Sequence, residues 1–518
     1  MHEAFFFRLL NSDGKASALT DAVSAANEGG IINAVVYVVD PTSFRQVPGS
    51  SFAYWVSERI RRLFAELPAF EGDGRMVKQG LATADDFRFV RAWWEVAPQT
   101  ILDGANGPDW REDLTAFQNW CRHRPFEGKR WVPFAKGGIY SPYYADLHLV
   151  VNWERDGDEM KAFAGSVIRN PEFYFRPGLT WPLQGIYLSA QTVPGGCIFS
   201  VAGKLATADR PEELPAVLAL MNCKVFDFLV GLFAGKVGGV QYEVGLIGRV
   251  PLPRNFRVDP LCDHALAGYR AAAGRTRYDE RSHLFSLPVL LCASGNTLAA
   301  RLANWELQLI EAERQLTEYQ VEIDDIALRL YGIERQDQWA IQERFGTLEP
   351  SRDGVERDPD TEDEATATEP IVASRQLITD LLSYAVGCTC GRWDVRFVTE
   401  EQQPPVLPDP FAPLPVCSPG MLTGNDGLLL CKSPLDYPLR VSWDGILVDD
   451  LGPDDANPRR EDIVRRVREI LDLIWGAGSE AIEQEVCEIL GVRDLREYFR
   501  RPTGFFDDHR KRYSKSRR

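Results

Sequence analysis

The sequence contains no apolar run that approaches the roughly 20 residues of a membrane-spanning helix. Its first residues, Met1–Arg8, lack the basic segment and long apolar stretch of a secretory signal peptide. The ten cysteines are scattered, and the densest grouping, which begins at Cys388 and Cys390, lacks the C-x2-C spacing of common zinc sites. We therefore expect a cytoplasmic protein with reduced thiols, no membrane contact and no metal site.

The sequence also lacks the short motifs of common catalytic and nucleotide-binding sites. It has no G-x-x-x-x-G-K-[ST] loop, no G-x-G-x-x-G loop and no G-x-S-x-G elbow, and its six histidines form no H-x3-H pair. Ser141–Tyr144 resembles an amino-methyltransferase tetrad without the second proline, so we predict a turn with packed tyrosines. Gly238 and Gly239 also predict a turn. The E-x-K triplet within Asp156–Lys161, a pattern that nuclease sites use, has no identifiable partner acid. No catalytic residue is predicted.

Acidic residues outnumber basic ones. Lys and Arg total 58 against 75 Asp and Glu, which gives a formal net charge of −17. This balance argues against non-specific wrapping of nucleic acid, because affinity for nucleic acid comes from neutralised phosphates. A local basic surface is still compatible with it. The best candidate is the segment 121–140. It contains five Lys and Arg residues but a single acidic residue, Glu127, and aromatic residues are interleaved with the cations.

Periodicity and turn residues predict an α+β protein. A mixed α/β region over residues 46–280, with many short strand-like runs, is followed by a long helical spacer over 281–345. An acidic linker over 346–372 then leads to a smaller helical region with a basic tail, residues 373–518. Residues 1–45 look like the edge of a larger domain.

Four shorter segments carry specific expectations. Ala16–Glu28 predicts a helix, and Ile31–Val39 predicts an apolar strand of the kind found in parallel sheets covered by helices. The alternation in Phe87–Arg91 predicts a half-buried strand. Pro211–Phe233 predicts one core helix, because its apolar residues have helical spacing.

The segment Leu298–Leu330 has the clearest helical pattern. Its apolar residues recur in steps of four and three over more than four heptads, and Gly332 follows as a stop signal. The pattern predicts a long helix that needs partner helices, either as a spacer within the chain or as a dimer surface. The apolar seam comprises Leu298, Leu302, Trp305, Leu309, Ala312, Leu316, Tyr319, Ile323, Ile326 and Leu330.

Seven short strings follow one another along the chain. They are Pro48–Ser57, Gln79–Thr83, Trp93–Val96, Pro133–Gly138, Val151–Glu154, Phe175–Pro182 and Tyr242–Gly245. In this order they resemble the C-terminal, target-recognising half of large adenine-specific DNA methyltransferases. These are the PglX-type enzymes of phage-exclusion (BREX) systems and their type IIG restriction-modification relatives.

The resemblance implies methyl transfer from S-adenosylmethionine to adenine N6 at one DNA sequence, with the base flipped out of the duplex. The family's catalytic domain carries a glycine-containing cofactor loop and an N-P-P-Y-type tetrad, and this sequence has neither. Residues 1–45 resemble only the last helix and strand of that domain. We therefore expect no cofactor on this chain and a methyltransferase subunit or domain that binds S-adenosylmethionine. Double-stranded DNA and other phage-defence proteins are the further expected partners.

The resulting hypothesis is that the chain supplies sequence specificity. Cations of the 122–136 segment, with Arg176 and Lys204, are expected to contact phosphates, while Gln241 and Arg249 read base edges. The full expected set is Arg122, Arg124, Lys129, Arg130, Lys136, Gly137, Gly138, Arg176, Lys204, Gln241 and Arg249. Four aromatic residues of the same strings are expected in the core, namely Trp131, Phe134, Trp153 and Trp181.

Two alternatives stay open. The chain is a degenerate methyltransferase or nuclease in its own right, or it is a structural assembly protein that uses the Leu298–Leu330 helix and touches no DNA.

Overall fold

The computed structural model describes residues 3–9, 12–27, 35–138, 140–234, 240–346, 370–450 and 460–514. Helices predominate, and the strands form several small sheets, so the predicted α+β class is confirmed. The glycine pair at 238–239 and nearly all of the predicted acidic linker lie outside the described residues.

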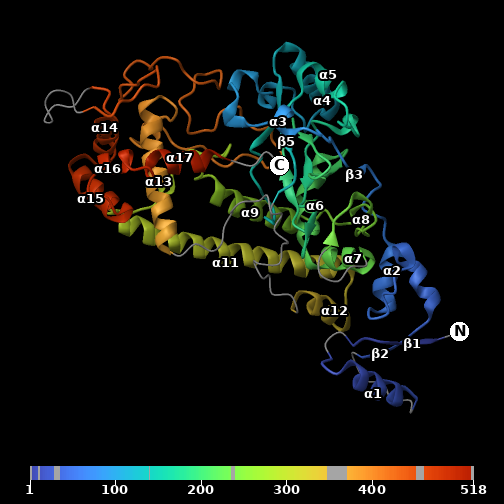
Figure 1. The fold of residues 1–518 in the computed structure, drawn as a ribbon. Coiled ribbons are helices and arrows are strands. Elements are labelled where there is room, and N and C mark those ends of the chain that lie inside the picture. The colour runs from blue at the N-terminus through green and yellow to red at the C-terminus, as the bar shows by residue number, and fades with distance from the viewer. Residues whose placement is uncertain are drawn as a thin grey trace.

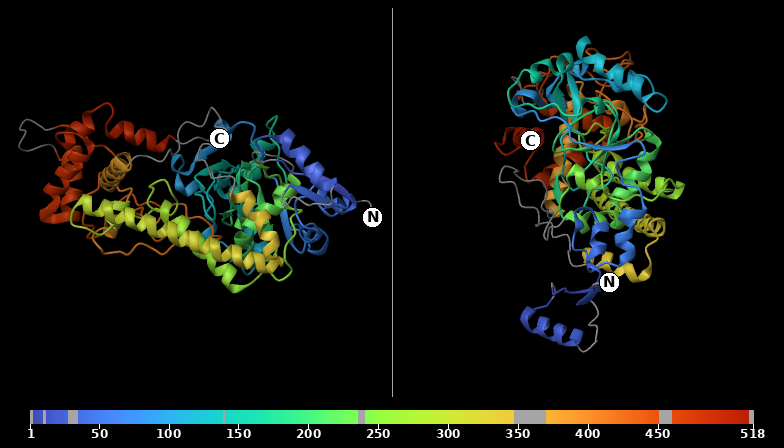
Figure 2. Two further views of the ribbon diagram at one scale, coloured as in Figure 1. Left: turned by 90° about the horizontal axis from the view of Figure 1, so that it is seen from below. Right: turned by 90° about the vertical axis from the view of Figure 1, so that its right-hand side faces the viewer.

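The N-terminal unit is a helix flanked by two strands. It comprises β1 (Ala4–Phe7), α1 (Lys15–Asn27) and β2 (Val36–Val39). The helix was predicted, but the expected parallel sheet is wrong, because β2 pairs antiparallel with β1 and Phe5 lies opposite Val38. The apolar Ala4–Phe7 run supplies the partner strand that sequence reasoning missed. Figures 1 and 2 show this unit standing beyond the rest of the molecule.

The central region holds two four-stranded sheets, ordered β10-β5-β6-β4 and β3-β11-β7-β9, and the two-stranded ribbon β8–β12. All neighbouring strands are antiparallel except β10 and β5. The bounds are β3 (Arg75–Lys78), β4 (Val90–Ala92), β5 (Trp131–Ala135), β6 (Leu149–Asn152), β7 (Gly178–Thr180), β8 (Gln184–Gly185), β9 (Gln191–Val193), β10 (Ile198–Phe199), β11 (Leu205–Ala208) and β12 (Val240–Gln241).

The sheet that contains β5 and β6 lies between two hydrophobic cores. Successive side chains of a strand point to opposite faces, and β6 divides its residues accordingly. Leu149 and Val151 belong to the core of the central region, whereas Val150 belongs to a second core that includes Phe285 and Trp393. The sheet thus joins the central region to the C-terminal helices.

The helices before residue 297 are mostly short. They are α2 (Glu58–Glu66), α3 (Asp86–Phe89), α4 (Leu114–His123), α5 (Glu154–Lys161), α6 (Leu214–Asn222), α7 (Lys224–Ala234), α8 (Val244–Ile247), α9 (Asp259–Thr276) and α10 (Val289–Cys292). Two of them correct the sequence predictions. Phe87–Phe89 is helical because the Asp85 side chain caps the turn by accepting from the Arg88 amide, and only Val90–Ala92 is a strand. The predicted core helix over 211–233 is two buried helices, α6 and α7, bent by 66° at Cys223.

Among the described residues, no single helix has the length and apolar content to cross a membrane. The bent pair α6–α7 passes that test only when its two helices are taken together.

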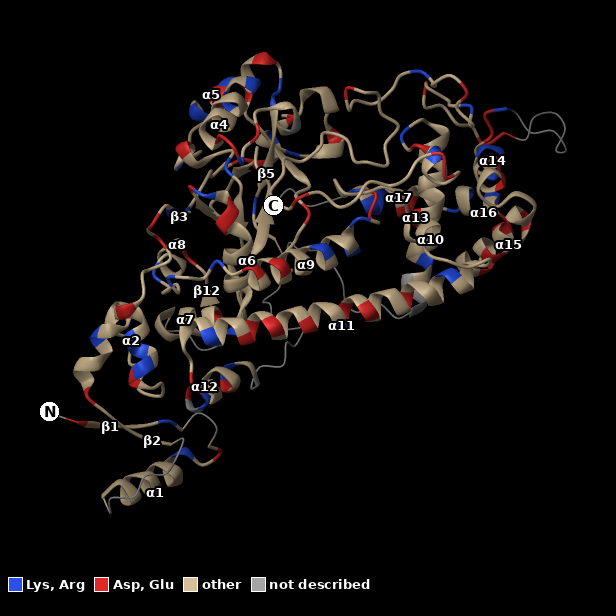
Figure 3. Ribbon diagram, turned by 180° about the vertical axis from the view of Figure 1, so that it is seen from behind, with Lys and Arg blue, Asp and Glu red and all other residues tan. Residues whose placement is uncertain are grey.

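Helix α11 (Leu298–Tyr331) confirms the predicted long helix. Thr297 caps its start by accepting from the Ala300 amide, and Gly332 ends it in the left-handed conformation. The helix runs along one side of the molecule, from the C-terminal helices to α7 and α12 (Arg335–Gly346) (Figure 1). Its seam packs within the chain, most extensively on α9. Acidic residues outnumber basic ones along the helix (Figure 3).

The C-terminal region is built from helices around the second core. These are α13 (Pro370–Thr389), α14 (Ile463–Trp475), α15 (Ser479–Leu490), α16 (Leu495–Arg500) and α17 (Phe505–Tyr513). Residues 401–425, which are rich in proline, contain neither helix nor strand. Helix α17 is tied into this region, since its Arg512 is buried against Glu280 and Asp380.

Candidate nucleic-acid interface

Two of the predicted cations, Arg122 and Arg176, meet at the loop 170–176. Arg122, in the last turn of α4, donates hydrogen bonds to the carbonyl oxygens of Pro171 and Glu172, at 3.2 and 3.1 Å. Gln118, one turn earlier on α4, accepts from the Arg176 Nε at 3.3 Å and donates to Glu172 and Tyr174 carbonyls. Helix α4 therefore holds the loop through Arg122 and Gln118 and positions Arg176 of the loop.

A partly buried aromatic ring of this loop, that of Phe173, lies near two cations. The Lys78 ammonium is 5.6 Å and the Arg176 guanidinium 5.7 Å from the centroid of the Phe173 ring. We name Lys78, Arg122, Phe173 and Arg176 the Phe173 cluster. Sequence reasoning missed Lys78 and Phe173, because β3 and the loop are far apart in the chain. The only signal was that Lys78 adjoins the Gln79–Thr83 string.

Surface carboxylates balance part of this positive charge. Asp209 pairs with Arg176 at 2.9 Å, and Glu71 pairs with Lys78 at 2.5 Å. Both carboxylates are well exposed, so their ion pairs are weak in water. A phosphate oxygen can replace such a carboxylate, since guanidinium and ammonium groups recognise both anions.

Three other predicted cations surround β5. Arg124 pairs with Glu127, and Arg130 lies 3.7 Å from Glu154 and donates to the Asn152 amide oxygen at 3.1 Å. Lys129 is partly buried, and this burial lowers the pKa of its amine, as does the nearby positive charge of Arg124. These cations remain predicted phosphate contacts.

Lys136 forms an ion pair with Asp86, and both side chains are largely buried. Gly137 has a φ of 87°, a left-handed conformation that favours glycine, and a Cβ there would lie 3.2 Å from the Ala202 carbonyl oxygen. A Cβ on Gly203 would lie 2.3 Å from the Gly137 nitrogen, so the two backbone segments approach each other closely. Gly138 is less constrained, with its nearest neighbour 3.6 Å from a built Cβ. DNA contact at these positions stays a prediction.

Lys204 is fully buried. Its amine donates to the Tyr242 carbonyl oxygen at 3.1 Å and pairs with Glu243 at 3.0 Å. Burial lowers the pKa of the Lys204 amine, while the Glu243 carboxylate opposes that shift. The lysine anchors the segment that follows β12 and presents no charge to the surface, so we leave it out of the proposed interface.

The two residues expected to read base edges lie on neighbouring elements. Gln241 is on β12, directly opposite Gln184 of β8. Arg249 follows α8, is exposed, and makes no side-chain ion pair or hydrogen bond with the described part of the chain. Phe134, Trp153 and Trp181 are buried as expected, and Trp131 is half-buried between the Arg91 and Arg130 guanidinium groups.

The tyrosines of the 141–144 segment are part of the core. Tyr143 is buried with a φ of 73°, and its hydroxyl donates to the Gln320 side chain on α11 at 2.7 Å. The Tyr144 hydroxyl donates to Asp146 at 3.1 Å. The predicted packing of the tyrosines is confirmed, but the segment is a bend followed by an isolated bridge between Tyr143 and Gln191 and not the predicted turn. In the part of the chain that the structure describes, no three His, Cys, Asp or Glu side chains are grouped to hold a metal ion.

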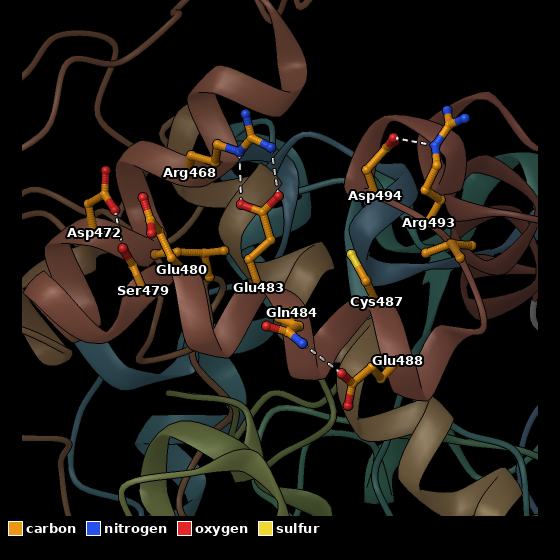
Figure 4. Close-up of a pocket in the computed structure, with 12 residues that line it drawn as sticks. Arg468, Asp472, Ser479, Glu480, Glu483, Gln484, Cys487, Glu488, Arg493 and Asp494 are labelled. Carbon is orange, nitrogen blue, oxygen red and sulfur yellow. Dashed lines mark hydrogen bonds and ion pairs between the residues drawn. The ribbon is translucent and has the colours of Figure 1, made fainter.

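A groove of about 710 Å³ lies between α14, α15 and the start of α16 (Figure 4). Five acidic and two basic side chains line it. Most of these groups bind one another, as in the two hydrogen bonds of 2.7 and 2.8 Å from Arg468 to Glu483. An acidic lining repels phosphates, so this groove is not a candidate for DNA contact.

Comparison with known proteins gives two relatives of the same kind. The chain is 24% identical over 494 residues to the adenine-specific methyltransferase BrxX of Escherichia coli O9:H4 (strain HS), which covers 91% of this chain and 36% of the relative. It is 23% identical over 375 residues to the adenine-specific methyltransferase PglX of Lacticaseibacillus casei (strain Zhang), covering 70% of this chain and 28% of the relative. The chain is homologous to these methyltransferases at low identity. It spans about a third of their length. No protein-family model matches it.

Proposed function

We propose that the chain is the sequence-specific DNA recognition part of an adenine-N6 DNA methyltransferase in a phage-defence system of the BREX or restriction-modification type. The homology to adenine-specific methyltransferases, which extends over 91% of the chain, is the observation that carries this proposal. The chain corresponds to about a third of those relatives, and the catalytic tetrad and cofactor loop of such enzymes are not in its sequence.

The Phe173 cluster is the proposed centre of phosphate contact. Helix α4 and β3 hold its three cations, and the carboxylates opposite them are exposed enough for a phosphate to displace. The cations near β5, Arg124, Lys129 and Arg130, extend the proposed surface. Phosphate contacts fix the register of the duplex, while Gln241 and Arg249 supply side chains suited to base edges.

The N-terminal unit is the proposed docking surface for the catalytic part. Phe5 and Val38 lie opposite each other in the two-stranded sheet and are both exposed, as are Leu19 and Val23 one turn apart on α1. An exposed apolar group of this kind is typical of an interaction surface. The occupant would be a methyltransferase domain or subunit that binds S-adenosylmethionine and receives the flipped adenine.

Selection from a randomised DNA duplex library by gel shift tests the recognition role. The chain, alone or with its catalytic partner, is expected to enrich one sequence. If no site-dependent binding is found even with the partner present, the proposal is wrong.

Incubation with labelled S-adenosylmethionine and DNA separates recognition from catalysis. We expect methyl transfer only when the catalytic partner is added. Transfer by this chain alone would show that it is an enzyme in its own right.

A further inference from the structure

The ribbon β8–β12 places two glutamines side by side. Gln184 and Gln241 are directly opposite each other in an antiparallel pair, so their Cβ atoms are about 5 Å apart on one face. Gln184 is exposed and Gln241 half-buried. Neither side-chain amide makes a hydrogen bond with a described side chain or backbone group.

Hydrogen bonds hold the chain next to the ribbon in place. The residue after Gln241 is Tyr242, whose amide donates to the Leu183 carbonyl oxygen at 2.9 Å. The Tyr242 carbonyl oxygen accepts from the Trp181 indole at 2.9 Å and from the Lys204 amine at 3.1 Å. Its hydroxyl donates to buried Asp227 at 2.7 Å. The backbone beside the two glutamines is therefore fixed, whereas their side-chain amides form no hydrogen bond with the described residues.

The fixed backbone, together with side-chain amides that have no hydrogen-bond partner among the described residues, favours a role for Gln184 and Gln241 in reading the DNA sequence. A glutamine amide forms two hydrogen bonds with the N6 and N7 atoms of adenine in the major groove, which is wide enough to admit a two-stranded β-ribbon. Stacked base pairs are about 3.4 Å apart, and two glutamine side chains whose Cβ atoms are about 5 Å apart are long enough to converge on neighbouring pairs. A rigid base holds such groups in place before binding, which reduces the entropy lost when the contact forms.

We propose that Gln184 and Gln241 read two neighbouring A·T base pairs of the target from the major groove. This inference rests on the proposed DNA recognition and adds Gln184 to it. It also assigns the chemical identity of two positions in the recognised site.

Binding-site selection followed by affinity measurements tests the assignment. Wild type is expected to require A·T at two adjacent positions, with a penalty of about 10- to 100-fold for a G·C replacement at either. Gln184→Ala and Gln241→Ala should each lose that penalty at one position and keep it at the other. Replacement of adenine by 7-deazaadenine, which lacks N7, should weaken wild type and leave the corresponding variant unaffected at that position.

Gln308→Ala is the matched control, because Gln308 is an exposed glutamine on α11, outside the ribbon. It should keep the wild-type preference, and circular dichroism melting should show that all variants are folded. If wild type is sequence-specific but both ribbon variants keep every base preference, the ribbon assignment is wrong and the proposed function stands. If wild type has no sequence preference even with the catalytic partner present, both are wrong.

Discussion

The Tyr242 hydroxyl donates a 2.7 Å hydrogen bond to the buried carboxylate of Asp227. The other oxygen of this carboxylate accepts from two nitrogens of Arg344 on α12, at 2.8 and 3.0 Å. Helix α12 in turn pairs with the N-terminal unit through Glu343 and Arg8. A continuous set of polar contacts thus connects the ribbon β8–β12 with the N-terminal unit, the proposed docking surface for the catalytic part.

Tyr242→Phe should lower the free energy of unfolding by about 1.5–3 kcal/mol, the usual contribution of a hydrogen bond to a charged group. Urea unfolding measures this change. Tyr140→Phe is the control, because the Tyr140 side chain is exposed. Removal of its hydroxyl should change the free energy of unfolding by less than about 0.5 kcal/mol. An equal effect of the two substitutions would contradict the assigned role of the Tyr242–Asp227 bond.

Arg512→Met should destabilise the protein by about 3–5 kcal/mol, because it leaves two carboxylates without their buried cation. Arg512 pairs with Glu280 at 3.3 Å and with Asp380 at 2.7 Å. Arg510→Gln removes an exposed cation from the same helix and should have little effect. Chemical denaturation of both variants checks the difference. Similar stabilities would mean that the end of α17 is not bound as the structure shows.

Asp380 predicts a pH dependence of stability. Burial raises the pKa of its carboxyl to about 6 from an ordinary value of 3.8, and the Arg512 charge opposes that shift. The folded protein therefore binds more protons than the unfolded chain between these two values. The contribution of Asp380 to stability is present below about pH 4 and is lost as the pH rises through about 6.

Asp380→Asn tests this sign, since asparagine does not titrate. Its unfolding free energy, relative to wild type, should increase between pH 4 and 7 in a series of urea titrations. Asp507 is the opposite case, because hydrogen bonds from Lys511 and then Arg510 lower the pKa of its carboxyl. Asp507→Asn should lose stability relative to wild type as the pH rises toward 4. Equal trends for the two variants would refute the assignment.

Ile323→Ala should cost about 2–5 kcal/mol, because the Ile323 side chain is fully buried in the seam between α11 and its neighbours. Ile310→Ala on the same helix is the control, since Ile310 is 63% exposed. Unfolding and sedimentation velocity together check the prediction. A change of oligomeric state in Ile310→Ala would support the alternative that α11 is a dimer surface.

The long helix shows what the sequence pattern predicts well. Its heptads extend over the whole of α11, and Thr297 and Gly332 supply local caps that need no distant partner. Shorter patterns were ambiguous. At Phe87 the alternation of a strand also fits one helical turn, and the Asp85 cap decides in favour of the turn. Between α6 and α7 the apolar spacing is unbroken, so the bend at Cys223 has no counterpart in it.

The residues of the candidate site were harder to predict than the long helix, because the charge of a side chain does not determine whether that side chain is exposed. Lys204 was expected at a phosphate, but the fold buries it against Tyr242 and Glu243. Lys78 was overlooked, and the fold places it near the ring of Phe173, which Arg176 also contacts. Both outcomes depend on contacts between distant segments, which a single sequence does not reveal.

Fluorescence anisotropy on the selected duplex and on a scrambled duplex, over a range of salt concentrations, tests the central claim most directly. The selected duplex should bind tighter, and Lys78→Gln/Arg176→Gln should reduce the slope of log affinity against log salt by about 2, one for each lost phosphate contact. Arg314→Gln/Arg468→Gln removes the same charge from exposed ion pairs elsewhere and should bind like wild type. Equal affinity for both duplexes, or an unchanged slope in the Lys78/Arg176 variant, would contradict the account.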